Sequence, residues 1–210
     1  MSATCCSEPT VFDGTSRAYK RVLWIVIAIN ATMFAVETGA GFFAKSMALQ
    51  ADALDFLGDS VTYGLSLLVI GRTVRWRAGA ALFKALSLGA FGIWVFGATL
   101  YRTMVLGMPE PLTMGGIAGL ALAANVASAW LLFRFRDGDA NVRSVWICSR
   151  NDAIGNVAVI GAAGAVAWLA SPWPDLIVAA AMAMLFLRGA WEIQRQARDE
   201  WTAAAAPEPA

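Results

Sequence analysis

Three aspartates, Asp52, Asp55 and Asp59, lie within the apolar stretch S-M-A-L-Q-A-D-A-L-D-F-L-G-D-S at 46–60, and this stretch continues without a charge through 61–70. At about 100° per residue the three side chains fall on one stripe of a helix. If the helix spans a membrane, each charge at mid-depth costs about 2.5–3.5 kcal/mol. Such a row is tolerated only where something binds it, and a cation is the simplest ligand.

A second polar stripe follows in the sequence N-V-R-S-V-W-I-C-S-R-N-D-A-I-G-N at 141–156, where Cys148, Asp152 and Asn156 recur every fourth residue. Residues at this spacing share one helix face. Together with Asp55 and Asp59, Cys148 and Asp152 give three carboxylates and one thiolate. This set suits a divalent ion such as Zn²⁺, and the sulfur shifts preference toward softer ions such as Cd²⁺. The alternative is that these groups only hydrogen-bond between helices.

The elements that carry these residues are apolar runs long enough to cross a membrane. Hydrophobic residues make up 59% of the chain and charged residues 15%, with a mean hydropathy of +0.60, whereas soluble domains are about 45–50% apolar. The predicted spans are 21–43, 47–71, 80–103, 113–133, 142–169 and 176–187, the last extendable by Pro174 and Ala190. We therefore predict an all-α, polytopic membrane protein with six transmembrane helices.

The same runs predict the domain organisation. A flexible polar tail at 1–16 precedes a single transmembrane domain at 17–190, and a juxtamembrane helix with an Ala/Pro tail follows at 191–210. The polar first residues predict no cleaved signal peptide. The net charge of +1 does not favour a nucleic-acid partner.

Positive charges predict the orientation in the membrane. Only Lys45 and Arg102 lie on one side of the predicted spans, whereas the termini and the second and fourth loops carry twelve basic residues: Arg17, Lys20, Arg21, Arg72, Arg75, Arg77, Arg134, Arg136, Arg143, Arg188, Arg195 and Arg198. The positive-inside rule then gives cytoplasmic termini in a bacterial-type inner membrane. In this topology Asp59 and Asp152 meet roughly 15–18 Å deep in a core of about 30 Å, with Asp55 and Cys148 one turn away on either side.

Other chemistry-bearing residues are few. The chain has three cysteines and no histidine, so a metal site must use Asp, Glu, Asn, Ser or Cys. Cys5 and Cys6 are adjacent, which does not favour a disulfide framework; they could capture a soft metal or be incidental thiols of the tail. Asn30 and Glu37 lie seven residues apart on one face of the first span. No nucleophile elbow, phosphate loop or histidine base favours an enzyme.

The motifs also resemble a known family. G-x-x-A-x-S-M-A-L-x-A-D-A-x-D-x-x-x-D at 41–59 and N-x-R-S-x-x-x-C-x-x-x-D at 141–152 are similar to the second-helix and fifth-helix signatures of the cation diffusion facilitator family. The resemblance covers about residues 17–190. It implies a six-helix, usually dimeric exporter that exchanges a divalent metal for protons, with Asp55, Asp59, Cys148 and Asp152 as metal ligands. Asp52, Glu37 and Asn156 are secondary candidates for the metal site.

Two departures from the family pattern bear on this expectation. Cys148 stands where zinc exporters more often have histidine, and we find no counterpart of the family's C-terminal cytoplasmic domain in the sequence, which resembles a short form. We expect metal/proton antiport without a resident cofactor, zinc being the first expectation and cadmium or cobalt alternatives, with a homodimer resting on the small residues of 115–129 and 155–167. The alternative is a non-transporting membrane metal sensor or assembly partner. Arg150 is expected to snorkel or, preferably, to pair with Glu37.

Overall fold

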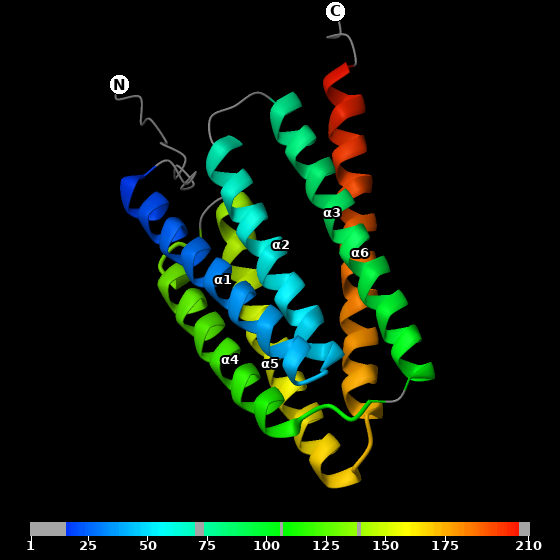
Figure 1. Cartoon of the computed structure of the whole chain (residues 1–210). Helices are drawn as coiled ribbons and strands as arrows, with labels where there is room; N and C mark the ends of the chain where they lie inside the picture. Colours follow the sequence, from blue (N-terminus) through cyan, green and yellow to red (C-terminus); the bar gives the residue numbers. More distant parts are fainter. Residues whose placement is uncertain (1–15, 70–73, 106, 138–139, 206–210) are drawn as a thin grey trace, which may run out of the picture.

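Six helices make up the computed structural model of the chain, which describes residues 16–69, 74–105, 107–137 and 140–205 (Figure 1). They are α1 (Arg17–Phe43), α2 (Met47–Val69), α3 (Val74–Met104), α4 (Pro111–Phe133), α5 (Ala140–Leu169) and α6 (Trp173–Ala205). No strand occurs among the described residues. The all-α prediction is therefore confirmed. The thiols Cys5 and Cys6 and the predicted tail up to residue 15 lie outside the described residues.

Five of the helices are long and apolar enough to cross a membrane, namely α1, α3, α4, α5 and α6. α2 is as long as α4, with 23 residues, but every 18-residue stretch of it contains Asp52, Asp55 and Asp59. It nevertheless lies lengthwise among the apolar helices (Figure 1). The chain is thus a multi-pass integral membrane protein, and the aspartate stripe lies on α2, packed among the apolar helices.

The last predicted span is part of a longer helix. α6 runs without a break from Trp173 to Ala205, so the predicted sixth span and the juxtamembrane segment after it form one element. Residues 188–205 contain no proline and a single glycine, Gly189, and therefore nothing ends the helix there. α3 likewise begins at Val74, before the predicted start at residue 80.

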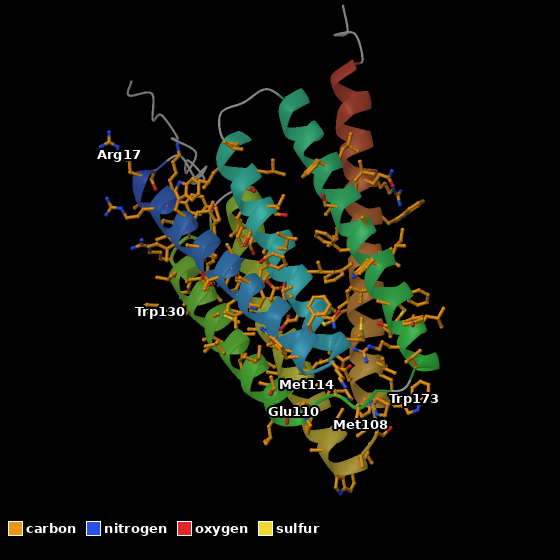
Figure 2. All side chains as sticks on the ribbon, viewed as in Figure 1. Arg17, Met108, Glu110, Met114, Trp130 and Trp173 are labelled. Atoms are coloured by element: carbon orange, nitrogen blue, oxygen red, sulfur yellow. The ribbon has the colours of Figure 1, made fainter. Side chains whose placement is uncertain are left out.

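The two ends of the bundle differ in their connections. Both termini lie at one end, which we call the termini end, and the α1–α2, α3–α4 and α5–α6 connections lie at the other, which we call the far end (Figure 1). Arg17 marks the first, and Glu110 and Trp173 the second (Figure 2). At the far end Glu110 caps α4 by accepting from the N–H groups of Leu112 at 3.2 Å and Thr113 at 2.6 Å. The Thr113 hydroxyl and these N–H groups hold the pKa of the exposed Glu110 carboxyl below its usual range.

The helices pack mainly in three pairs, α1 with α2, α4 with α5, and α3 with α6. One core cluster joins α2, α4, α5, α6 and Val95 of α3 in the far half. In the termini half, a second cluster of described residues comes from α1, α2, α4 and α5. α6 accordingly diverges from α2 toward the termini end (Figure 1). Among the described residues, a core cluster that includes α3 and α6 together with α2, α4 and α5 therefore lies only in the far half.

Candidate metal site

The two polar stripes meet between α2 and α5. Asp152 interacts electrostatically with Asp55, Asp59 and Cys148, and its carboxyl group hydrogen-bonds that of Asp59. All four side chains are partly buried. Since an ionised carboxylate only accepts hydrogen bonds, two carboxyl groups can bond to each other only when one carries a proton. The structure thus places the four predicted ligands in one region, with the Asp59 and Asp152 carboxyl groups within hydrogen-bonding reach of each other.

These groups do not surround a single point. Within the described part of the chain, no three Cys, Asp or Glu side chains converge closely enough to form a metal centre. One carboxyl oxygen of Asp152 is buried without a hydrogen-bond donor among the described residues. The arrangement is a cluster of acidic groups held near one another on two helices, rather than a closed coordination shell.

Tyr63 belongs to this region although the sequence reasoning did not single it out. Its hydroxyl donates to Oδ2 of Asp59 at 2.5 Å, and it lies 3.4 Å from the carbonyl oxygen of Val145 and 3.5 Å from Oγ of Ser149. The side chain is fully buried. The signal was present in the sequence, because Tyr63 follows Asp59 by four residues and therefore continues the aspartate stripe.

α1 supplies two polar side chains, Asn30 and Glu37, to the face of α2 that carries the aspartates. The Asn30 amide donates to Oδ2 of Asp59 at 3.5 Å. Glu37 is fully buried and lies within hydrogen-bonding reach of Asp52, with Asp55 also acting on it electrostatically. Neither oxygen of Glu37 has a hydrogen-bond partner among the described residues.

Asp52 and Asn156 pair with each other on the far-end side of Asp59 and Asp152. With its amide oriented to suit its neighbours, Asn156 donates to both carboxyl oxygens of Asp52 and accepts from Nδ2 of Asn125 at 2.9 Å. All three are at most 2% exposed. This network joins α2, α5 and α4. The structure thus places Asn156 against Asp52.

The predicted pairing of Arg150 with Glu37 is wrong. Arg150 is exposed; its guanidinium lies 5.2 Å from the ring centroid of Trp146 and donates to Asn151 at 3.3 Å. Trp146 lies four residues before Arg150 on the same helix, so a local contact satisfies the charge. Burying it beside Glu37 would instead require its desolvation.

The small residues proposed for a dimer pack partly within the chain. A Cβ added at Gly115 of α4 would lie 3.5 Å from Cβ of Ala163 in α5. Ala118 of α4 and Ala162 of α5 are buried in the same core cluster. These residues bring α4 and α5 close together, and one face of each small-residue stretch is therefore an internal contact.

Comparison with known proteins decides the family. The model of the cation efflux transmembrane domain matches residues 23–200. The chain belongs to the cation efflux family. Zinc transporter ZitB of Escherichia coli is 28% identical over 196 residues, covering 86% of this chain and 62% of the relative. Metal cation efflux system protein CzcD of Cupriavidus metallidurans is 27% identical, covering 82% and 58%.

A third relative is the cadmium, cobalt and zinc/H(+)-K(+) antiporter of Bacillus subtilis, 24% identical over 85% of this chain and 62% of the relative. The chain thus spans about three fifths of the length of these curated relatives. The matched region contains α2 and α5 in full. Both stripes of the candidate site lie within the part of the chain that defines the family, in a multi-pass protein of the bacterial inner-membrane type.

Proposed function

We propose that this chain exports a divalent transition-metal cation from the cytoplasm in exchange for protons, zinc first and cadmium or cobalt as alternatives. The observation that carries the proposal is the Asp59–Asp152 carboxyl pair, contributed by two helices and flanked by Asp55 and Cys148. The names of the relatives, zinc transporter and cadmium, cobalt and zinc/H(+)-K(+) antiporter, support the cargo and the exchange.

The chemistry of the site couples the two ions. Carboxyl and thiol groups bind a divalent cation only after they lose their protons, so binding of the metal releases protons. When the metal leaves, desolvation and mutual repulsion favour protonation of crowded carboxyl groups such as those of Asp59 and Asp152. One set of side chains thus holds either the metal or protons, which is what an antiporter requires.

The packing of the bundle supports a proposal of alternating access to this site. The far half is closed by a core that includes α6, whereas the core of the termini half is formed by α1, α2, α4 and α5. With the termini cytoplasmic, as the basic residues predict, this conformation faces the cytoplasm. A cation enters from that side and leaves after α3 and α6 rearrange against the other four helices.

Transport into inside-out proteoliposomes with an imposed pH gradient tests the proposal. Wild-type protein is expected to take up Zn²⁺ and release protons, and Asp59→Asn and Asp152→Asn are expected to abolish uptake. Asp137→Asn is the matched control, because Asp137 is exposed and pairs only with Arg136, at 3.5 Å, among the described residues. Metal-dependent uptake that persists in a well-expressed Asp59→Asn/Asp152→Asn protein would refute the site; bound metal without uptake by the wild type would favour a sensor.

A further inference from the structure

Asp175, far from the candidate metal site in sequence and at the start of α6, is a buried carboxylate that the proposed exchange does not use. It is 1% exposed. Its Oδ1 accepts from Oγ of Ser46 at 2.5 Å and from the N–H of Ala48 at 3.0 Å, and its Oδ2 accepts from the N–H of Met47 at 2.8 Å. All three donors belong to the start of α2. We call these four residues the far-end latch.

The latch satisfies groups that a helix cannot satisfy by itself. The first N–H groups of a helix have no intrahelical partner and carry its positive dipole end, so an anion there is stabilising. Ser46 serves its own helix as well, since its Oγ accepts from the N–H of Leu49 at 3.1 Å. Asp175 thus acts as the cap of a helix more than 120 residues earlier in the chain, and Arg102 of α3 acts electrostatically on the same carboxylate.

The latch joins α6, which is paired with α3, to α2, which is paired with α1. α6 packs mainly against α3, and α2 packs mainly against α1. Ala48 of the latch and its α6 neighbours Leu176 and Ala179 belong to the far-half core, each at most 5% exposed. In the termini half, the described core cluster that joins α1, α2, α4 and α5 includes no residue from α3 or α6. The strongest polar tie between α2 and α6 is therefore at the end that is closed in this structure.

We propose that the far-end latch holds the far end of the bundle closed, and that α6 must release α2 there each time the site opens to that side. Asp175 is then a positioning residue, because it sets the balance between the two open states without touching the cargo. The inference rests on the proposed function for its purpose. The closing contact itself can be tested without any metal.

A single thiol buried in the far-half core reports on opening. Cys5, Cys6 and Cys148 are replaced by serine, and Ala179→Cys places the thiol in the closed core, where Ala179 is 0% exposed. A charged, membrane-impermeant thiosulfonate is added to the far side of right-side-out vesicles. Asp175→Ala is expected to speed labelling about tenfold or more, because it removes hydrogen bonds to a charged group. Ser46→Ala, which removes only the 2.5 Å bond, is expected to give a smaller increase.

Glu110→Gln is the matched control. Glu110 is also a far-end carboxylate that caps a helix, but it caps its own helix, α4, and joins no second element through that cap. Labelling that is unchanged in Asp175→Ala, or that rises equally in Glu110→Gln, would overturn the latch. If Asp175→Ala does not fold, Asp175→Asn and Ser46→Ala decide in the same way, since Asp175→Asn keeps one acceptor oxygen.

A transport measurement distinguishes a positioning role of Asp175 from a folding defect in Asp175→Ala. If Asp175→Ala populates the cytoplasm-facing state less, the apparent KM for cytoplasmic metal rises, because only the competent fraction binds. A mere folding defect lowers the maximal rate and leaves KM unchanged, and that result would count against the latch. Absence of uptake by the wild-type chain, with labelling still accelerated in Asp175→Ala, would refute the proposed function and leave the closing contact standing.

Discussion

The hydroxyl of Tyr63 and the amide of Asn30 meet the same carboxyl oxygen, Oδ2 of Asp59, at 2.5 Å and 3.5 Å. These contacts orient the carboxyl group that bonds to Asp152. Groups that orient metal ligands in this way tune both the geometry and the basicity of a site. At this scale the chemistry of the site depends on neutral donors as well as on acids.

Tyr63→Phe is therefore expected to weaken metal binding about tenfold, in line with the loss of a supporting hydrogen bond to a ligand. The ring is retained, so the buried packing of Tyr63 persists and unfolding is little affected. Calorimetric titration of the purified protein with Zn²⁺ measures the change. Tyr101→Phe is the control, since Tyr101 is 66% exposed at the end of α3; an affinity equal to wild type in Tyr63→Phe would contradict this role.

Cys148 gives the site its one soft donor. Cys148→His is expected to move the preference from Cd²⁺ toward Zn²⁺, because imidazole is a harder ligand than thiolate. Competitive uptake of the two ions into proteoliposomes measures the ratio of rates. Cys5→Ser/Cys6→Ser serves as the comparison for loss of thiols elsewhere. An unchanged ratio in Cys148→His would remove Cys148 from the ligand set.

Sequence spacing predicted which acids come together but not how they are held. The spacing and the predicted depth placed Asp59 and Asp152 in one region. The spacing also placed Asn156 on the stripe of Asp152, but it did not predict that Asn156 pairs with Asp52 and Asn125. The contribution of α4 depends on how closely that helix approaches α5. Spacing along one helix carries no information on this approach. Arg150 was misassigned for a related reason, because its local partner Trp146 competes with any distant carboxylate.

At the scale of helices, Gly92 of α3 lies where α3 and α6 approach each other closely. A Cβ at Gly92 would lie 2.8 Å from Cγ and 2.9 Å from Cδ2 of Leu187, and 3.2 Å from the carbonyl oxygen of Ala183. The Leu187 side chain would have to move. Gly92 is therefore the position where these two helices tolerate no larger residue without rearrangement.

Gly92→Ala is expected to destabilise the protein by about 1–3 kcal/mol through overpacking. Gly97→Ala on the same helix is expected to be neutral or to stabilise by about 0.5–1 kcal/mol, because alanine favours the helix and nothing lies within 4 Å of its Cβ. Denaturant unfolding in detergent, followed by circular dichroism, compares the two. Equal stabilities would show that α3 and α6 are less tightly packed at Gly92 than the structure indicates.

At the scale of the whole molecule, six apolar runs predicted the helix order and most helix ends. The role of Asp175 was not predicted, because a cap received from another helix leaves no local motif. The length of α6 was also underestimated, since hydropathy falls after Leu187 although helix propensity does not. Hydropathy marks where a chain meets lipid, whereas helix ends depend on breaking residues and caps.

Both termini are expected to be cytoplasmic, because twelve basic residues lie on their side of the predicted spans and two on the other. A fluorescent protein fused after residue 205 should therefore be bright, and alkaline phosphatase fused there should be inactive. Fusions in the α3–α4 connection near Gly107 should show the reverse and provide the matched control. Active phosphatase at the C-terminal fusion would reverse the orientation and with it the direction of transport.

The pairing of α3 with α6 also constrains biogenesis. α1 and α2, like α4 and α5, are consecutive in the chain, so each pair can associate as soon as its second helix has entered the bilayer. α3 has its principal partner at the end of the sequence. During synthesis α3 lacks this partner, and Gly92 has no contact with α6, until α6 emerges from the translocon. A ribosome stalled after α5 would leave a partly assembled protein whose third helix is available to quality-control proteases and chaperones.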